Sequence, residues 1–376
     1  GRFVANNIIK IRSIQNKENR DFAVLYRTNA QSRSIEDALR INNIPYKIFG
    51  GLSFYQRKEI KDVLAYLKLI INKNDEESLK RIINYPPRGI GQTTIDKLSV
   101  ASNDFGLSIF ELIENENISN LKINNNTIEK LRDFVYMIKN FNLLNNKMSA
   151  YEITKEVIDR IGIIDHLKID STTEEINKIQ NIEELLNGIN ELKIINDELI
   201  DSKIKLSTFL EDVSLATDFD DKKNNNDNSV SLMTVHLAKG LEFSDIYIVG
   251  LEEDLFPSPM NIDSRNGLEE ERRLFYVALT RAKNKINISY SQTRYRWGNL
   301  DFCEPSRFIS EIDSVYVENH STIKEKNSLK IKSESYNSVD KPSDSKLKKL
   351  KKIDLFYENK NIKKNIDVKS GIYVYH

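Results

Sequence analysis

The order of strand-like and helix-like segments is the feature that most constrains how this chain can fold. Strand patterns occur in two groups, one at the start of the chain and one after a long gap: FAVLYRTN (22–29), IPYKIFGG (44–51), VSLMTVH (230–236), SDIYIVG (244–250) and KINISY (285–290). Between the groups, helical periodicity dominates. Short strands that alternate with helices bury both faces only beside parallel neighbours. The sequence therefore predicts one α/β domain with a parallel sheet, interrupted by a mainly α-helical insertion.

This pattern divides the chain into four segments. Residues 1–74 would form the first part of the α/β domain, 75–217 the helical insertion, 218–314 the rest of the α/β domain, and 315–376 a basic, flexible tail. The tail contains KLKKLKK and ends in GIYVYH, a strand pattern that would begin a truncated small β domain. Because the chain begins with glycine rather than methionine and inside a helical pattern, we expect it to be a fragment of a longer protein.

Composition excludes several classes of protein. Lys+Arg and Asp+Glu both total 56, so no global positive field indicates a nucleic-acid partner, and any basic surface must be local. The single cysteine, Cys303, and the four histidines exclude a disulfide framework and an ordinary Cys/His zinc cluster. No apolar run approaches the ~18 to 20 residues that cross a bilayer, and no signal peptide is recognisable. We therefore expect a cytoplasmic protein without membrane contact.

The sequence also lacks two kinds of catalytic motif. No segment matches G-x-x-x-x-G-K-S/T, the loop whose backbone cradles phosphates. Glu252 and Asp254 follow an apolar strand, as metal-holding acids often do, but without that loop there is no phosphate-bound Mg²⁺ for them to hold. No Ser/His/Asp or Cys/His arrangement is specified either. The chain alone therefore does not carry a complete site for phosphate or acyl chemistry.

Residues suited to ligand binding nevertheless lie in TVHLAKGLEF (234–243). This segment follows one strand and precedes another, at the carboxyl edge where α/β folds bind ligands. Gly240 permits close backbone approach, and Glu242 can accept a hydrogen bond from a ribose hydroxyl. Thr234 and His236 can form hydrogen bonds to a phosphate or to a coupling network. From spacing alone, an ordinary crossover loop with a satisfied histidine remains the alternative.

Two arginines lie at comparable places. LYRTNAQSR adds Tyr26, an aromatic face for a base, and Arg27, a guanidinium, at the end of another strand. EEERRLFYVALTRAK (269–283) predicts an amphipathic helix with Arg281 near its end. An arginine there can serve the surface and the helix dipole, or it can donate to a phosphate oxygen. Motif context has to decide between these roles.

Five segments, taken together and in order, supply that context. They resemble the C-terminal half of the UvrD/PcrA/Rep family of superfamily 1 DNA helicases, over roughly residues 22–312: AVLYRTNAQSR, GGLSFYQRKEIKDVLAYL, RIINYPPRGIGQTTIDKL, LMTVHLAKGLEF and EEERRLFYVALTRA. That family has two RecA-like domains, each with an inserted helical subdomain, and moves 3′ to 5′ along single-stranded DNA using ATP. The resemblance implies that this chain is the second RecA-like domain, a P-loop NTPase-type fold without the half that carries the P-loop.

The resemblance also implies roles for single residues at a nucleotide site. ATP would lie between the two RecA-like domains, with the Mg²⁺ ligands on the half that this chain does not contain. Tyr26 would stack on the adenine, and Arg27 and Arg281 would be the catalytic residues that reach the γ-phosphate. Glu242, beside Gly240, would hold the ribose.

Further residues would contact DNA. The segment RGIGQTT resembles a hairpin that contacts duplex DNA, in which backbone N–H groups and hydroxyls meet phosphates, through Arg88, Gly89, Gly91, Thr93 and Thr94. A tight turn between two helices is the alternative. Tyr55, Arg57 and Lys58 would touch the single strand, although an exposed helix start explains them almost as well. Thr234 and His236 complete the set of DNA-binding candidates. The implied partners are single-stranded DNA, single-strand/duplex junctions, the N-terminal half of the helicase and, through the basic tail, a protein.

The sequence thus predicts the C-terminal motor portion of an ATP-dependent 3′–5′ DNA helicase that acts in repair or replication. The chain alone would be inactive, since it needs the P-loop domain. Two alternatives remain: the helicase subunit of a recombination helicase-nuclease, and a non-catalytic DNA-binding remnant. The tail argues against the former, because it lacks the carboxylate and lysine cluster of a nuclease.

Overall fold

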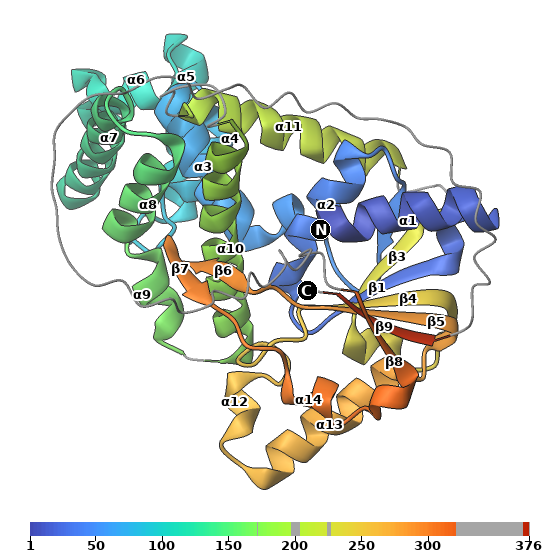
Figure 1. Ribbon diagram of the computed structural model, residues 1–376. Helices are drawn as coiled ribbons and strands as arrows, with labels where there is room; N and C mark the ends of the chain where they lie inside the picture. The colour runs from blue at the N-terminus through green and yellow to red at the C-terminus, as the bar shows by residue number, and fades with distance from the viewer. Residues whose placement is uncertain (171, 197–203, 224–226, 321–370, 376) are drawn as a thin grey trace, which may run out of the picture.

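A computed structural model describes residues 1–170, 172–196, 204–223, 227–320 and 371–375 of the chain. Two bodies lie side by side in Figure 1: a sheet with helices on both faces, and a group of helices inserted into it. No helix in the described ranges is long and apolar enough to cross a membrane.

The sheet confirms the predicted α/β class. Its described strands are all parallel and follow the order β2-β3-β1-β4-β5-β9-β8. The strands are β1 (Phe22–Tyr26), β2 (Tyr46–Ile48), β3 (Val230–Thr234), β4 (Phe243–Val249), β5 (Ala282–Ser289), β8 (Val317–His320) and β9 (Gly371–Tyr375). Strands from both ends of the chain alternate within this sheet, because β1 pairs with β3 on one side and with β4 on the other.

The last strand differs from the prediction for the C-terminal segment. GIYVYH was expected to begin a separate small β domain, but residues 371–375 pair with β5 and β8 inside the main sheet. This pairing satisfies backbone N–H and C=O groups of β5 that an open edge would leave unpaired. The basic run at 346–352 lies outside the described residues.

Helices cover both faces of the sheet because its strands alternate. On β1, Phe22 and Val24 face α1 (Arg2–Gln15) and α2 (Ser32–Ile41), in a core that also contains Ile8. Ala23 and Leu25 face the other side, where α13 (Arg265–Leu279) and the short helices α12 (Pro259–Ile262) and α14 (Arg307–Ser310) lie. The two faces of one strand therefore belong to two separate cores.

The insertion between β2 and β3 is helical, as predicted. It contains α3 (Lys58–Ile71), α4 (Glu76–Ile82), α5 (Gln92–Phe105), α6 (Ile109–Glu114), α7 (Asn125–Asn145), α8 (Ala150–Ile161), α9 (Ile163–Lys168), α10 (Thr173–Asn196) and α11 (Leu206–Lys223). These helices share one hydrophobic core that already includes Phe54 and the apolar face of α3. We therefore propose that the insertion begins near Ser53 rather than at residue 75, because only packing reveals which core receives α3.

Local signals explain several helix ends. Ser149 and Glu152 form a capping box at the start of α8, and Ser108 and Glu111 form another at the start of α6. α8 ends at Gly162, whose φ of 68° is left-handed and therefore suits glycine.

The two bodies meet through charged side chains. Arg33 of α2 has only 3% of its side chain exposed and lies 2.8 Å from both Glu184 and Glu191 of α10, and 2.9 Å from Asp37. Gly188 lies between the two glutamates on α10, and a Cβ at this position would come within 2.8 Å of the Arg33 Nη1 atom. The glycine therefore makes room for the guanidinium between two turns of the helix.

A two-stranded hairpin extends from the sheet toward the insertion. Its antiparallel strands are β6 (Thr293–Arg296) and β7 (Asn299–Phe302), and in Figure 1 it lies beside α10. The turn residues Trp297 and Gly298 have φ values of 50° and 83°, the signature of a two-residue hairpin turn with both central residues left-handed.

Candidate functional site

The carboxyl ends of β1 and β3 lie next to each other and bring the first predicted residues together. Tyr26 pairs with Thr234 in the register, so Arg27 follows β1 beside the start of the loop that holds His236. This loop begins with a short helix, η5 (Val235–Ala238), which packs on α13. Ligands of α/β folds bind at such an edge.

Arg27 is held by a carboxylate that the sequence analysis did not single out. Its Nε and Nη2 atoms donate to Glu271 of α13 at 2.9 and 2.6 Å, and the two side chains are 16% and 2% exposed. Glu271 also accepts hydrogen bonds from the Asn261 side chain at 2.6 Å and from the backbone N–H of Ser258 at 3.2 Å. Burial alone would raise the pKa of Glu271, but these donors, Arg27 and Asn261 first among them, lower it below its ordinary value.

His236 lies close to the same pair. Burial lowers the pKa of its imidazole below the ordinary 6.5, and the positive charge of Arg27 lowers it further, whereas Glu271 opposes this effect. The ring is therefore mainly neutral at pH 7, with one nitrogen that donates and one that accepts. Such a ring suits hydrogen bonding to a neutral or anionic ligand without adding charge.

Arg281 connects the end of α13 with the loop after β3. Its Nε donates to the backbone oxygen of Val277 at 3.0 Å, and its Nη1 donates to that of Leu241 at 3.1 Å. The backbone N–H of Phe243 in turn donates to the Arg281 oxygen at 3.0 Å. The predicted residues Gly240, Glu242 and Arg281 are thus brought together, and the Glu242 side chain, 63% exposed, lies 3.7 Å from Lys283.

The two arginines lie at different heights along α13. Arg27 contacts Glu271, and the Nε atom of Arg281 donates to the backbone oxygen of Val277, six positions further along α13, which corresponds to roughly 9 Å at 1.5 Å per residue. The loop from η5 to Glu242 runs between them, since it approaches Arg27 through His236 and Arg281 through Leu241. A ligand contacted by both guanidinium groups would have to lie along this loop.

Tyr26 does not offer a ring face in this structure, contrary to the sequence-based expectation. Its side chain is 1% exposed and belongs to the core under α1 and α2, and burial raises the pKa of its hydroxyl. The reason is the alternation along β1, which turns Arg27 toward α13 and Tyr26 toward the opposite face.

Tyr55 and Arg57 are also buried, at 8% and 9% exposure, so neither contacts the single strand in this arrangement. Arg57 donates to the Asn29 backbone oxygen at 3.0 Å and to the Asn181 side chain at 2.8 Å. Its role here is to join the sheet body to α10. Lys58, the next residue, is exposed.

The segment from Arg88 to Gly91 forms a tight turn before α5, and Thr93 and Thr94 lie in the first turn of that helix. The Arg88 guanidinium points inward and donates to the backbone oxygen of Ile82 at 2.9 Å, which contradicts a direct phosphate contact by this side chain in the present arrangement. Gly89 has a φ of 73°, and Gly91 is the N-cap of α5 without a side-chain cap. Gly91 and Thr93 are exposed and Thr94 is partly exposed, so the first N–H groups of this helix face solvent. Backbone contacts to phosphate remain compatible with this turn.

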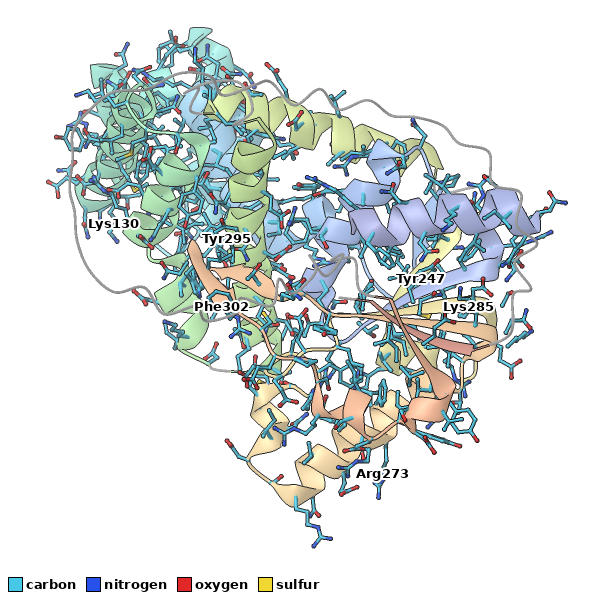
Figure 2. All side chains as sticks on the ribbon, viewed as in Figure 1. Lys130, Tyr247, Arg273, Lys285, Tyr295 and Phe302 are labelled. Atoms are coloured by element: carbon cyan, nitrogen blue, oxygen red, sulfur yellow. The ribbon has the colours of Figure 1, made fainter. Side chains whose placement is uncertain are left out.

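Lys130 adds a cation at the same turn. This residue of α7 lies so close to Gly89 that a Cβ there would come within 2.9 Å of its ammonium nitrogen; Figure 2 labels it on the outer side of the insertion. Arg273, in contrast, extends away from the sheet on the outer face of α13.

Two features were missed from the sequence although signals for them exist. Glu271 shares the three-and-four spacing of Leu274, Phe275 and Ala278, which marks it as a carboxylate on a buried stripe. The turn Trp297-Gly298 lies between two alternating segments, a pattern that indicates a hairpin.

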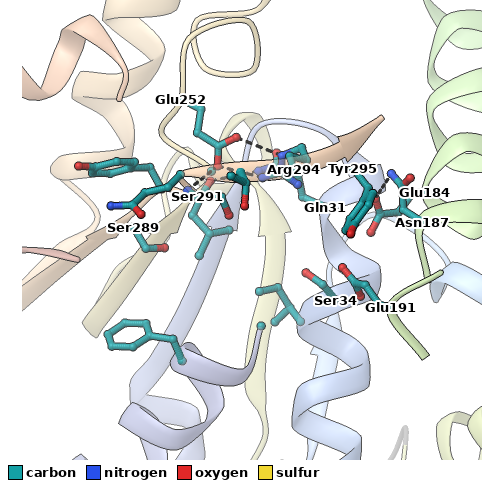
Figure 3. Close-up of a pocket in the computed structure, with 18 of the residues that line it drawn as sticks. Gln31, Ser34, Glu184, Asn187, Glu191, Glu252, Ser289, Ser291, Arg294 and Tyr295 are labelled. Carbon is teal, nitrogen blue, oxygen red and sulfur yellow. Dashed lines mark hydrogen bonds and ion pairs between the residues drawn. The ribbon is translucent and has the colours of Figure 1, made fainter. Parts of the chain in front are cut away.

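A cavity of about 550 Å³ lies between the sheet edge, the hairpin and α10 (Figure 3). Its lining includes Gln31, Glu252, Ser291 and Tyr295 on one side and Glu184 and Asn187 of α10 on the other. In the described part of the chain, no group of three or more His, Cys, Asp or Glu side chains is arranged to hold a metal ion.

Residues 1–293 match the model of the UvrD-like helicase C-terminal domain, and the chain belongs to this family.

Among individual proteins, it is similar to the ATP-dependent DNA helicase PcrA of Bacillus subtilis strain 168, with 36% identity over 86% of this chain and 44% of that protein. PcrA of Staphylococcus aureus strain Mu50 is 36% identical over 85% of the chain and 43% of the relative, and PcrA of Staphylococcus epidermidis is 37% identical over 81% and 41%. The chain therefore spans about two fifths of the length of these relatives.

Proposed function

We propose that this chain is the C-terminal motor portion of an ATP-dependent 3′–5′ DNA helicase that acts in DNA repair or replication. The observation that carries the proposal is that one loop connects three distant segments: His236 lies near Arg27 at the carboxyl ends of β3 and β1, and the same loop ends at Glu242 beside Arg281, at the amino ends of β4 and β5. The curated PcrA relatives, named as ATP-dependent DNA helicases, support the same activity.

ATP with Mg²⁺ would supply the phosphoryl group whose hydrolysis drives movement, and the Mg²⁺ ligands and phosphate cradle would come from a P-loop domain outside this sequence. The residues here fit one wall of such a site. Because Arg281 is partly exposed, its guanidinium can turn toward a phosphate, and the exposed Glu242 can accept a hydrogen bond from a ribose hydroxyl. Arg27 would exchange Glu271 for a phosphate oxygen, whereas Tyr26, 1% exposed in the core under α1 and α2, does not fit a role in stacking on a base.

DNA would contact the outer surfaces. Thr234 and His236 lie at the sheet edge, and the exposed turn at Gly91 offers backbone N–H groups to phosphates, which position a duplex without reading its sequence. Trp297 at the hairpin tip is 37% exposed and can stack on a base. Single-strand/duplex junctions are the substrate that engages all three regions.

The test is ATPase reconstitution. The chain alone should show negligible ATP hydrolysis, and addition of the P-loop half of a PcrA-type helicase should produce DNA-stimulated hydrolysis. Arg281→Ala should lower this rate about 10³- to 10⁵-fold, as loss of an arginine at a transferring phosphate does in related systems, or about 4 to 7 kcal/mol of barrier.

Arg273→Ala is the matched control, because this arginine lies on the same helix with 77% of its side chain exposed and contacts only Glu270 among the described ion pairs. Robust hydrolysis by the chain alone would refute the proposed division of labour. Junction binding without any reconstituted hydrolysis would instead favour a non-catalytic DNA-binding role.

A further inference from the structure

A side chain joins the ends of β1 and β4 where their backbone pairing stops. The last pair in the register of these strands is Leu25 with Ile248. Beyond it, the side-chain oxygen of Gln31 accepts from the backbone N–H of Arg27 at 2.9 Å, and the side-chain nitrogen donates to the backbone oxygen of Val249 at 3.1 Å. A side-chain amide has the same donor and acceptor as a peptide group, so Gln31 extends the hydrogen bonding of the sheet to the residue that bears a candidate catalytic guanidinium.

The segment that carries Gln31 is itself held in place. Gln31 is the last residue of the short helix η2 (Asn29–Gln31) and forms a capping box with Thr28, whose backbone N–H donates to the same side-chain oxygen at 2.9 Å. The buried Arg57 donates to the backbone oxygen of Asn29, at the start of η2, at 3.0 Å. The Gln31 amide therefore reaches the strand ends from a fixed base.

Gly250 leaves space for this amide. It follows Val249, the last residue of β4, and a Cβ at Gly250 would come within 2.1 Å of the Gln31 side-chain nitrogen. Its φ of 67° is also left-handed, a conformation that glycine adopts without strain. If the amide were removed, the N–H groups of Arg27 and Thr28 and the oxygen of Val249 would lose the partner that they have here, and backbone groups that lack a partner are costly to bury.

Arg27 has two attachments that act on different parts of the residue. Its backbone N–H is held by Gln31, whereas its guanidinium is held by Glu271 at 2.6 and 2.9 Å. A phosphate would replace Glu271 as the partner of the guanidinium and leave the backbone contact in place. Because a displacement of about 1 Å at a catalytic group can cost about 10²-fold in rate, the backbone contact decides how well the guanidinium meets a phosphate.

We propose that Gln31 is a positioning residue: its side-chain amide fixes the backbone of Arg27 against the end of β4 and thereby sets where the Arg27 guanidinium can reach. The action of that guanidinium on a phosphate rests on the proposed function; the hold on its backbone does not. Both ends of the amide already have backbone partners, so Gln31 acts through Arg27 and not on a ligand. The ends of β1 and β4 then move together.

Hydrogen exchange, followed by NMR on the 376-residue chain without ATP or DNA, tests the hold on Arg27. Gln31→Met keeps the length of the side chain but lacks the amide. The backbone N–H of Arg27 should then exchange at least about 10-fold faster relative to that of Val24 in the same strand, and the Nε–H of Arg27, bound to Glu271, should also exchange faster. Gln31→Glu, which keeps an acceptor at this place, should exchange more slowly than Gln31→Met. Wild-type exchange of Arg27 in Gln31→Met would overturn the proposal.

ATP hydrolysis by the chain combined with a P-loop half tests the consequence for the reaction. Gln31→Met should lower kcat about 10- to 100-fold and change the KM for ATP by less than about twofold, because a misplaced guanidinium weakens the transition state more than it weakens binding. In an Arg27→Ala background, Gln31→Met should have little further effect on kcat. An equal loss of kcat in both backgrounds would indicate general damage and contradict the positioning role.

The two experiments separate this proposal from the proposed function. If the combined wild-type chains do not hydrolyse ATP, the proposed function fails, and hydrogen exchange alone decides whether Gln31 holds Arg27. If they hydrolyse ATP but Gln31→Met keeps the wild-type kcat, the proposed function stands and the positioning role of Gln31 is overturned. Gln15→Ala is the control, since this glutamine is the last residue of α1, before the amino end of β1, and it should match the wild type in both experiments.

Discussion

Substitution of Gly188 by alanine should destabilise the protein, although alanine is the better helix former. In an ordinary helix interior this change gains about 1 kcal/mol. Here the added Cβ would lie 2.8 Å from Nη1, 2.9 Å from Cζ and 3.0 Å from Nε of Arg33, which are far below normal contact distances. The guanidinium would have to move by about half an ångström or more, which must lengthen at least one of its ion pairs at 2.8 to 2.9 Å.

The expected magnitude follows from two opposing effects. Overpacking typically costs about 1 to 3 kcal/mol, and a strained contact between Arg33 and the largely buried Glu184 adds to this cost. The pairs with Asp37 and Glu191 are more exposed and contribute less. After subtraction of the gain in helix propensity, Gly188→Ala should lower the free energy of unfolding by about 1 to 2 kcal/mol.

The sign should reverse when Arg33 is absent. In an Arg33→Ala background the space over Gly188 is free, so Gly188→Ala should stabilise the variant by up to about 1 kcal/mol. Urea unfolding followed by circular dichroism at 222 nm, on all four combinations, measures both effects. If Gly188→Ala stabilises the wild-type chain, or if it changes the free energy of unfolding equally in both backgrounds, the inference that this glycine leaves space for Arg33 is refuted.

Two predictions concern titration at the sheet edge. The pKa of Glu271 is lowered in the folded protein, so the stability that its ionised form contributes is complete above the ordinary value of 4.5 and is lost as the pH falls through the lower folded value. Glu271→Gln should therefore be less stable than the wild type at pH 7 but lose less stability on acidification. A melting-temperature profile of the variant from pH 7 to 3 that is as steep as that of the wild type would contradict this. The pKa of His236 lies below 6.5 partly because of the charge of Arg27, so Arg27→Met should raise this pKa in an NMR titration. Arg20→Met, a control at an exposed arginine that pairs with Glu18, should leave it unchanged. A His236 pKa that stays the same or falls in Arg27→Met would exclude the coupling of these two residues.

The sheet was predictable because its signals are local. Each strand is a short apolar run. The long helical stretch between the two groups of strands is compatible with few folds other than a sheet domain that contains a helical insertion. The boundary of the insertion was not predictable in the same way, because α3 has an apolar face that suits either core. Its assignment depends on contacts with helices far away in the sequence.

The candidate site residues show the same difference between what local patterns predict and what depends on distant contacts. Gly240, Glu242 and Arg281 come together because neighbouring strands β4 and β5 begin side by side, and pairing of this kind follows from topology. Tyr26 and Arg57 differed from expectation because burial of a polar side chain depends on its partners, such as Asn181 for Arg57, and no local pattern reveals them. Motif recognition locates residues along the chain, but the alternation of β1 decides which core each of them faces.

Strand β3 has a consequence for how the two bodies communicate. It is the shortest covalent path from the insertion, which ends before Val230, to the loop that starts after Thr234. Hydrogen bonds to β2 on one side and β1 on the other prevent this strand from stretching or sliding without loss of its register. A pull on the insertion is therefore not passed to the loop by stretching or sliding of this strand. Side-chain contacts also join the bodies, among them those of Arg33, those of Arg57 and the contact of the hairpin turn with Tyr151.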